Sequence, residues 1–331
     1  MPADFEVSPD ISDGINVGLM GLGVVGAGVA AHILSNGSSL LGLTGRTVNL
    51  KKVLVRDRFR VRDVELPEGV LTTNAEDILS DPDIDIVVEV MGGTYPAEDY
   101  LKQALAAGKH IVTANKEVMA KSGSELMTLA RDNNANLLFE ASVGGGIPIV
   151  GCMMNELAAN DIRSIRSIIN GTTNYILTKM AQERTGFEQA LVEAQGLGYA
   201  ESDPTNDIEG IDAAYKLTIL ASLAYRRSFQ PSDIYREGIS KLEPQDFRYA
   251  EELGYAIKSL AIANLDEEAV QLRVYPALVP AEHMLAKVDG VYNAVEVEGS
   301  LCGQVLVHGA GAGREPTTSA VVGDIIEAAC K

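Results

Sequence analysis

Short apolar runs separated by glycine-rich or amphipathic segments make up the first half of the chain. A short apolar run between turn signals predicts a buried strand, and helically spaced apolar residues between two such runs predict a crossover helix. The expected strands are Ile15–Leu22, Val48–Val55, Ile84–Met91, His110–Thr113 and Leu137–Ala141, with helices over Val24–Leu34 and Pro96–Ala107. This alternation predicts a parallel sheet whose ligand lies at the carboxyl ends of the strands.

The second half has a different pattern, in which most helices form one group and most strands form another. Helices are expected over Tyr175–Glu183 and Glu188–Gly196, from Asp207 onward, and over Thr317–Ala329. Strands are expected over Ile165–Asn170, Val270–Pro276, Ala294–Val297 and Gly303–Val307. Segregated helices and strands are typical of an α+β domain. A chain of 331 residues is too long for one ordinary core, so two domains are expected.

A glycine-rich turn joins the first apolar run to the first helix. Its residues are Gly21, Leu22, Gly23, Val24, Val25 and Gly26, which form the pattern G-x-G-x-x-G. In a strand–turn–helix context these glycines allow a tight turn, the approach of a pyrophosphate and close helix–strand packing. The sequence therefore predicts an α/β fold with a Rossmann dinucleotide-binding domain at residues 1–149, completed by 309–331, and an α+β substrate domain at 150–308.

The residues after the second strand bear on the choice of coenzyme. An acidic residue there binds the adenosine ribose hydroxyls of NAD, whereas an arginine accommodates the 2′-phosphate of NADP. Arg56 comes first and Asp57 follows it. This order favours NADP over NAD. For Arg58 and Arg60, a place in a solvated run of charges fits the sequence as well as a contact with the coenzyme does.

Polar residues follow the other predicted strands. Gly92 comes after the third strand, and Thr113 and Lys116 follow the fourth. We expect Lys116 on the nicotinamide side of the ligand site; the alternative is a capped helix start with an exposed lysine. The glycine run 144–146 favours a hinge over a cation-binding loop.

The richest polar stretch lies within residues 198–216. Asp212 and Lys216 are four residues apart and share one face of the predicted helix, and Glu201 lies in the turn before it. They form either a solvent-exposed ion pair or the floor of a polar pocket that handles a cationic group and a proton. Gly171 and Thr172 open a polar turn that could bind a substrate carboxylate or only cap the next helix.

Composition excludes several classes of protein. The 27 basic and 46 acidic residues give a net charge of −19, which argues against nucleic acid or an anionic membrane as a partner. There is no apolar run of membrane-spanning length, and the acidic N-terminal residues do not resemble a signal peptide, so a cytoplasmic location is expected. The three cysteines and four histidines lack metal-ligand spacing.

Taken together, these motifs resemble the homoserine dehydrogenase family over almost the whole chain. The matching segments are GLGVVG at 21–26, TANK at 113–116, EASVGGGIPI at 140–149, GTTNYIL at 171–177, GYAESDPTNDIEGIDAAYK at 198–216 and GAGAG at 309–313. The resemblance implies interconversion of L-homoserine and L-aspartate 4-semialdehyde with NAD or NADP. It also implies a homodimer, so the second domain is expected to serve dimerisation as well as substrate binding.

The resemblance further assigns roles to individual residues. It implies Lys216 as general acid/base with Lys116 assisting, and Glu201 and Asp212 as homoserine ligands. The coenzyme contacts that it implies include Gly198, Thr113, Lys116 and Gly313. It also implies a sodium ion on the loop of Glu140, Val143, Gly145 and Ile147, so this loop is expected to bind a cation and not to act as a hinge.

Many relatives carry a C-terminal ACT regulatory domain, whereas this sequence stops after its last helix at Lys331. We therefore expect no threonine feedback through such a domain. Two alternatives remain open: another two-domain amino-acid or aldehyde dehydrogenase, which leaves the 198–216 stretch unexplained, and a non-catalytic dinucleotide sensor, which has no use for the lysines and carboxylates.

Overall fold

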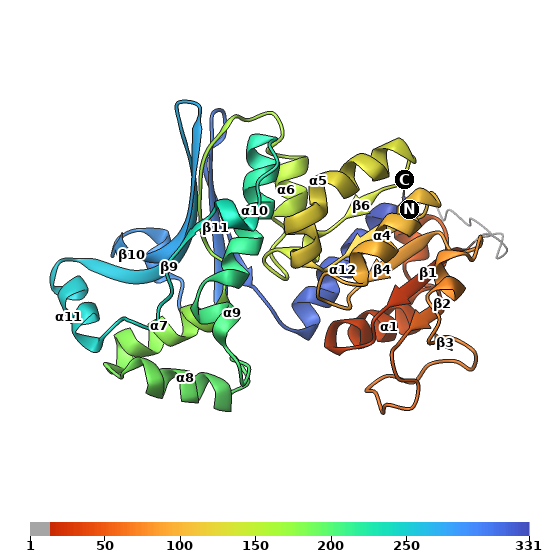
Figure 1. The fold of residues 1–331 in the computed structure, drawn as a ribbon, viewed down its shortest axis with the longest axis horizontal. Helices are drawn as coiled ribbons and strands as arrows, with labels where there is room; N and C mark the ends of the chain where they lie inside the picture. Colours follow the sequence, from red (N-terminus) through yellow and green to blue (C-terminus); the bar gives the residue numbers. More distant parts are fainter. Residues whose placement is uncertain (1–13, 331) are drawn as a thin grey trace, which may run out of the picture. The chain divides into compact units, whose positions relative to one another are not determined.

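The computed structural model describes residues 14–330 and contains two compact units (Figure 1). The first unit comprises Met1–Asn115, Glu125–Phe139 and Val321–Lys331, and the second comprises Lys116–Ser124 and Glu140–Ala320. How the functional domains divide the chain stays a prediction.

A six-stranded parallel sheet forms the centre of the first unit. Its strands are β1 (Ile15–Met20), β2 (Val48–Leu54), β3 (Leu71–Thr72), β4 (Ile86–Glu89), β5 (His110–Thr113) and β6 (Leu137–Leu138). They lie in the order β3-β2-β1-β4-β5-β6, the strand order of the dinucleotide-binding fold. The order reverses at β1 and β4, so the ligand crevice is expected at their carboxyl ends. The predicted fold class is confirmed.

Helices connect these strands. They are α1 (Val24–Asn36), α2 (Leu41–Thr44), α3 (Glu76–Leu79), α4 (Ala97–Ala106) and α5 (Lys116–Asp132), whereas α12 (Arg314–Ala329) follows the last strand of the chain. The connection through α1 runs from β1 to β2 and the one through α4 runs from β4 to β5, in opposite directions along the sheet. Because such crossovers are right-handed, α1 and α4 cover opposite faces.

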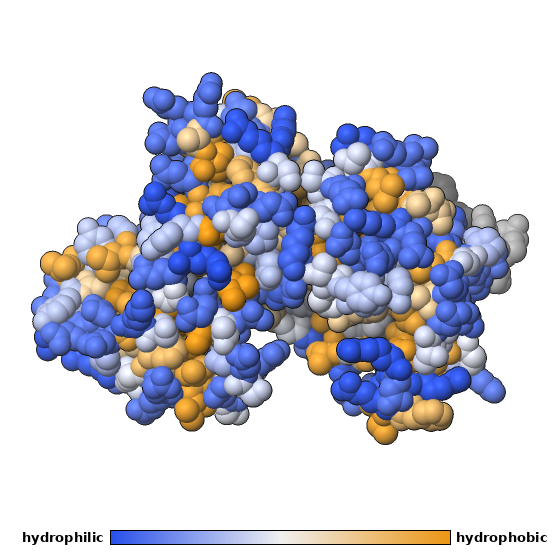
Figure 2. Space-filling model, in the orientation of Figure 1, coloured by the Kyte–Doolittle hydropathy of each residue, from blue (hydrophilic) through white to orange (hydrophobic). Residues whose placement is uncertain are grey.

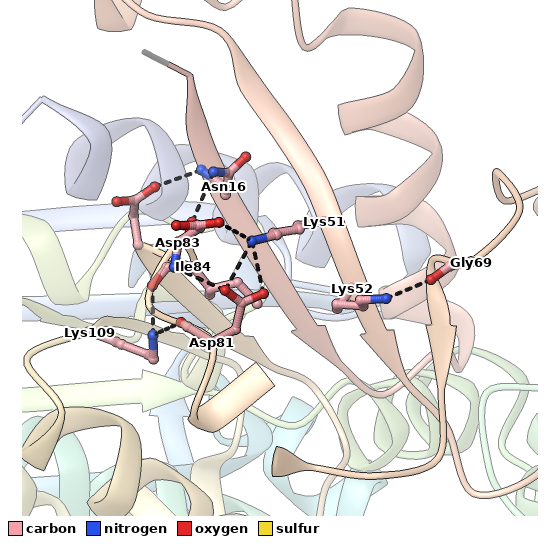
Figure 3. Close-up of polar contacts among 9 residues, drawn as sticks. Asn16, Lys51, Lys52, Gly69, Asp81, Asp83, Ile84 and Lys109 are labelled. Atoms are coloured by element: carbon pink, nitrogen blue, oxygen red, sulfur yellow. Dashed lines mark hydrogen bonds and ion pairs between the residues drawn. The ribbon is translucent and has the colours of Figure 1, made fainter. Parts of the chain in front are cut away.

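Charged residues tie together the amino-terminal ends of the strands in this sheet (Figure 3). The Lys51 ammonium lies 2.9 Å from carboxylate oxygens of both Asp81 and Asp83. Lys109 is buried and donates to the main-chain oxygens of Asp81 and Ile84. Burial lowers the pKa of Lys109, because it disfavours the ammonium form. This edge is opposite the ligand edge, so its charges stabilise the fold.

The second unit is built on a mixed sheet of six strands. They are β7 (Ile162–Ile168), β8 (Tyr235–Arg236), β9 (Tyr255–Asp266), β10 (Ala269–Pro280), β11 (Tyr292–Gly299) and β12 (Gly303–Ala310), in the order β12-β11-β7-β9-β10-β8. Only β8 and β10 pair in parallel; the other pairs are antiparallel. Figure 1 shows the long hairpin that β9 and β10 form.

Helices of the second unit pack on this sheet around a separate apolar core. They are α6 (Val150–Met154), α7 (Gly171–Glu183), α8 (Phe187–Gly196), α9 (Thr205–Ile208), α10 (Ile211–Tyr225) and α11 (Pro244–Glu252). The short 3-10 turns are Glu140–Ser142, Pro231–Asp233 and Met284–Lys287. Phe187 of α8, Phe247 of α11 and Ile176 of α7 meet in one buried cluster, and each fully buried side chain of this kind contributes roughly 1.5–3 kcal/mol.

Two sequence predictions in this unit were wrong in detail. The helix expected from Asp207 onward is interrupted, because Gly210 adopts φ 72° and separates α9 from α10. A Cβ at Gly210 would lie 2.9 Å from a methyl group of Val274, so the interruption lets α10 pack closely on β10. The polar turn expected at residues 171–174 is the first turn of α7, capped by Asn170.

The surface agrees with the acidic composition. Hydrophilic residues cover much of the face drawn in Figure 2, and a hydrophobic spot lies over the loop between β2 and β3. The exposed apolar residues of that loop are Phe59 and Val61. Within residues 14–330, no helix combines the length and apolar character that crossing a bilayer would require.

Candidate functional site

One buried carboxylate in the second unit holds two lysines. Asp212 lies in the first turn of α10 and is 4% exposed, because α10 packs apolar residues on most of its sides. Its Oδ1 lies 2.5 Å from the Nζ of Lys116, and its Oδ2 lies 2.7 Å from the Nζ of Lys216. The pair of Asp212 and Lys216 is therefore buried and not solvent-exposed, while its role as the floor of a polar pocket stays a prediction.

The charges of this cluster stabilise one another. Burial would raise the pKa of the Asp212 carboxyl, but attraction to Lys216 and Lys116 outweighs it and holds that pKa well below its usual range. Burial likewise opposes the charge of Lys116, but the attraction and hydrogen bond of Asp212 raise the Lys116 pKa above its ordinary value. Asp212 therefore stays ionised and Lys116 stays cationic at neutral pH.

Lys216 is held by two acceptors. Its Nζ donates to the main-chain oxygen of Ile169 at 2.8 Å and to Asp212 Oδ2 at 2.7 Å. Its side chain is only 12% exposed, so the amine has a fixed position. An ammonium has three N–H bonds, and the described residues use two of them. The third can serve a substrate oxygen.

Asn170, which the sequence analysis did not single out, connects this cluster to the start of α7. Its Nδ2 donates to Asp212 Oδ2 at 2.9 Å and to Asp207 Oδ1 at 2.6 Å, while its Oδ1 accepts from the N–H of Thr173 at 2.8 Å. Asp207 was missed as a site residue as well. Asn is a favoured N-cap residue, and an Asn before a Gly-Thr-Thr helix start was the signal that could have found it.

The predicted carboxylate-binding residues lie beside this cap. The Thr172 hydroxyl donates to the main-chain oxygen of Tyr199 at 2.6 Å and holds the segment after α8. A Cβ at Gly171 would lie 2.9 Å from the main-chain oxygen of Val291, so close packing also requires a glycine there. Gly198 has φ +77° with open space where a Cβ would project.

Glu201 is placed differently from the other acidic candidates. It is exposed, and its main-chain oxygen accepts from the side chain of Gln195 at 3.0 Å. Among the residues that the structure describes, no hydrogen bond or ion pair joins its carboxylate to Asp212 or the lysines. Its carboxylate is therefore available to a ligand.

The predicted cation loop lies between the first 3-10 turn and α6. The Glu140 carboxylate accepts from the N–H groups of Ile149, Val150 and Gly151 at 2.7–2.8 Å and so ties the loop to the start of α6. Gly144 and Gly145 have φ of +75° and +57°. No group of three or more His, Cys, Asp or Glu side chains suited to a metal occurs in residues 14–330.

Val143 and Ile147, the remaining members of this loop, are both buried. The main-chain oxygens of Glu140 and Ile147 each accept one N–H, and a carbonyl oxygen has a second lone pair. A Cβ at Gly145 would meet the carbonyl of Gly311 at 2.6 Å, so packing alone demands a glycine. Main-chain oxygens are suitable ligands for a hard cation.

The predicted phosphate-binding turn of the first unit has open space at Gly23. Cβ atoms at Gly21 and Gly26 would lie 2.9 Å from Val90 O and 2.2 Å from Gly21 O, so these glycines allow close packing. No atom lies within 4 Å of a Cβ at Gly23, which caps α1 without a side-chain hydrogen bond. The first turn of α1 has no acidic residue, so its N–H groups suit an anion.

The other predicted coenzyme residues are placed as follows. Leu22 and Val25 are partly buried and Val24 is exposed at the start of α1, while Arg56 is exposed after β2. Gly92 follows β4 with φ +74° and open space beside it. The Thr113 hydroxyl donates to the Glu89 carboxylate. Gly313, in the second unit, precedes α12 with φ +122°.

A dinucleotide-binding sheet with an open phosphate turn, in a chain that also holds two lysines on one buried carboxylate, defines a dinucleotide-dependent oxidoreductase. Two family models match the chain: "Homoserine dehydrogenase, NAD binding domain" over residues 21–140 and "Homoserine dehydrogenase" over residues 148–326. The chain belongs to the homoserine dehydrogenase family.

Known relatives agree with this assignment. The chain is 45% identical over 312 residues to the homoserine dehydrogenase of Bacillus subtilis, covering 94% of this chain and 72% of that protein. A crystal structure of a homoserine dehydrogenase from Thiobacillus denitrificans superimposes with a TM-score of 0.92 at 47% identity, covering 96% of this chain and 74% of that one.

A hyperthermophilic archaeal homoserine dehydrogenase, solved in complex with NADPH, has a TM-score of 0.80 at 29% identity and covers 96% of this chain and 98% of that one. The protein is thus an NAD(P)-dependent oxidoreductase that acts on a CH–OH group, and its reaction interconverts L-homoserine and L-aspartate 4-semialdehyde. The predicted family and reaction are confirmed.

Proposed function

We propose that Lys216 is the general acid/base of homoserine dehydrogenation in this chain. The observation that carries the proposal is the fixed Lys216 amine, which is bound by Asp212 and the Ile169 carbonyl and has one direction left for a substrate oxygen. Geometry of this kind is the first requirement for a proton-transfer residue.

The proton steps follow from that geometry. When bound, a nicotinamide coenzyme would supply the hydride acceptor for oxidation and the hydride donor for reduction. In oxidation the neutral amine of Lys216 takes the proton of the homoserine hydroxyl and becomes the ammonium as the C4–H bond breaks. In reduction the Lys216 ammonium gives a proton to the oxygen of the semialdehyde as a C–H bond forms. Lys116, which stays cationic beside Asp212, stabilises negative charge that develops on the same oxygen.

Asp212 acts on the substrate mainly through the lysines that it holds. Both of its oxygens accept charge-assisted hydrogen bonds, and Oδ2 accepts a further one from Asn170. The exposed carboxylate of Glu201 is better able to bind the substrate ammonium. Gly171 and Thr172 open α7, whose N-terminal N–H groups suit the substrate carboxylate. The contacts of Gly198, Gly313 and Thr113 with the coenzyme remain proposals.

We propose NADP as the preferred coenzyme, with NAD as the alternative. Arg56 is the first residue with an exposed side chain after β2, where a 2′-phosphate would lie in this fold. Replacing Arg56 with alanine should raise the KM for NADP about tenfold or more and leave the KM for NAD within about twofold. Equal effects on the two coenzymes would contradict this role.

A sodium ion on the main-chain oxygens of Glu140, Val143, Gly145 and Ile147 is a further proposal. The support is the glycine loop itself, where Gly144 and Gly145 have positive φ and the main-chain oxygens are of the kind that a hard cation prefers. Replacing sodium by choline at constant ionic strength tests it: lower thermal stability in choline is expected, and equal stability in both salts would contradict it.

The assembly and location are proposals as well. We propose a homodimer formed by the second unit, because closed two-fold dimers are the commonest assemblies of soluble proteins. Light scattering at two protein concentrations would test it. A cytoplasmic location fits an enzyme that draws on a cellular nicotinamide pool. Substrates are small molecules, and the net charge of −19 argues against nucleic acid or an anionic lipid surface as a partner.

The experiment for the function is a near-ultraviolet absorbance assay with purified protein, L-homoserine, and NAD or NADP in separate reactions. Homoserine-dependent formation of reduced coenzyme is expected, with L-aspartate and diaminopimelate giving none. Coenzyme binding without any homoserine oxidation would instead favour a non-catalytic dinucleotide sensor. Activity with diaminopimelate or L-aspartate in place of homoserine would favour the other dehydrogenase classes.

A further inference from the structure

A fully buried carboxylate ends the central strand β4 of the first unit. Glu89 has a relative exposure of 0% and takes no part in the chemistry proposed above. Its Oε1 accepts from the Met91 N–H at 2.7 Å, and its Oε2 accepts from the Thr113 hydroxyl at 2.7 Å. The Gly92 N–H and the Asn115 side chain also donate to this carboxylate.

These donors come from two different loops. Met91 and Gly92 belong to the loop after β4, whereas Thr113 is the last residue of β5 and Asn115 lies in the turn that follows it. Asn115 also donates to the main-chain oxygen of Gly93 at 2.7 Å, and its N–H donates to the Thr113 hydroxyl at 3.0 Å. Glu89 is therefore the common acceptor that joins both loops.

The carboxylate is stabilised in place although it is costly to bury. Burial raises the pKa of Glu89, while the hydrogen bonds from Thr113, Met91, Asn115 and Gly92 oppose that rise. A buried acceptor with this many donors fixes the conformation of the groups around it, because each donor would lose its partner if the loop moved. The loop after β4 needs such support, since Gly92 and Gly93 have φ of +74° and +73° and glycine is intrinsically flexible.

The strand order says what these loops would hold. The phosphate turn follows β1, and the adenosine ribose belongs at the end of β2. The order reverses at β1 and β4, so the other half of the dinucleotide belongs over the carboxyl ends of β4 and β5. Both loops joined by Glu89 lie at those ends, and a Cβ at Gly92 or Gly93 would project into open space.

We propose that Glu89 is the positioning residue of the nicotinamide half of the coenzyme site, where it fixes the loops after β4 and β5 in the conformation that binds the ring and its ribose. The inference rests on the proposed nicotinamide coenzyme. It assigns Glu89 a role through Met91–Gly93 and Thr113–Asn115 and not through contact with the reacting atoms.

The test compares intact coenzyme with a fragment that lacks nicotinamide. Isothermal titration calorimetry measures the Kd of NADPH and of 2′-phospho-ADP-ribose for the wild type and for Glu89→Ala and Glu89→Gln; NADH and ADP-ribose replace them if the wild type prefers NAD. We expect Glu89→Ala to weaken NADPH binding about tenfold or more, because several hydrogen bonds to the two loops are lost. Binding of the fragment should stay within about twofold of the wild type. Glu89→Gln keeps one acceptor and should recover part of the loss.

A matched control separates positioning from general stability. Lys109→Met removes another buried charge of the same unit at the opposite edge of the sheet, and it should lower the Tm without changing either Kd. The inference is overturned if Glu89→Ala weakens both ligands equally or neither. Should Glu89→Ala fail to fold, Glu89→Gln decides, and an unchanged ratio of the two Kd values overturns the proposal. Wild-type protein that binds no nicotinamide dinucleotide at all would refute the proposed coenzyme instead.

Discussion

Asp212→Asn isolates the charge at the centre of the site while keeping the shape of the side chain. Breaking a buried ion pair by removing one partner costs about 3–5 kcal/mol, because the other charge is left uncompensated. Lys116 is 41% exposed and can turn toward water, so it contributes little to this cost. Lys216 is 12% exposed and has no such freedom. We therefore expect a loss of about 3 kcal/mol in the free energy of unfolding at pH 7.

The pH dependence of this loss has a definite sign. The Asp212 pKa is lowered in the folded protein, so the stability it contributes is present above the unfolded pKa of about 3.9 and is lost as pH falls through the folded value. The Lys116 pKa is raised, so its contribution is present below about pH 10.4 and is lost as pH rises through the folded value. The difference between wild type and variant should therefore be constant from about pH 5 to pH 10.

The assay is urea unfolding followed by circular dichroism at several pH values, with Glu252→Gln as the control. Glu252 forms an exposed pair with Arg248 on α11, again four residues apart, and its loss should leave stability nearly unchanged. An Asp212→Asn protein within about 0.5 kcal/mol of the wild type at pH 7 would refute the claim that the cluster depends on this buried charge.

Two further substitutions test the residues around that charge. Asn170→Asp keeps the cap of α7 but sets a third carboxylate against Asp207 and Asp212; kcat/KM should fall about ten- to hundredfold at pH 7 and recover partly toward pH 5, when the carboxylates share a proton. A flat pH profile, or an equal loss in Asn170→Ser, would contradict the repulsion argument. Glu201→Ala should raise the KM for homoserine about tenfold with little change in kcat, and an unchanged KM in steady-state kinetics would remove Glu201 from substrate binding.

Local patterns predicted the first unit well. Its central strands β1 and β4 are largely buried and form apolar runs, and the glycines at 21 and 26 have a local steric reason. The short β3, α2 and α3 were missed because segments of two to four residues carry almost no periodic signal. Strand β6 is also shorter than predicted, since residues 140–142 turn into a 3-10 helix.

The second unit was harder because its pattern depends on tertiary contacts. The long strand β9 was not predicted: Ile257, Lys258, Leu260 and Ala261 are all buried, so its polar and apolar residues do not alternate. Lys258 is tolerated there because its ammonium binds the Asp289 carboxylate and the Val288 carbonyl. Helix α11 was missed as well, although its Pro lies at the first helical position, where proline is favoured.

The candidate site shows the same division between local and distant information. The pairing of Asp212 with Lys216 was visible because they are four residues apart on one helix. Its ion pair with Lys116 and its hydrogen bond with Asn170 join segments far apart in the sequence, and no local spacing encodes them. Glu89 was passed over because it stands inside an apolar strand, where a single acidic residue reads as an exposed position.

Lys216 as the proton-transfer residue is the central claim, and Lys216→Ala with chemical rescue tests it most directly. The variant's kcat for homoserine oxidation should fall by about two to four decades, the usual scale for a general acid/base, while its Kd for coenzyme stays near that of the wild type. Added primary amines should restore part of the activity in proportion to the concentration of free base. A variant that binds coenzyme and keeps kcat within about threefold of the wild type would contradict the account, because the proton would then have another acceptor.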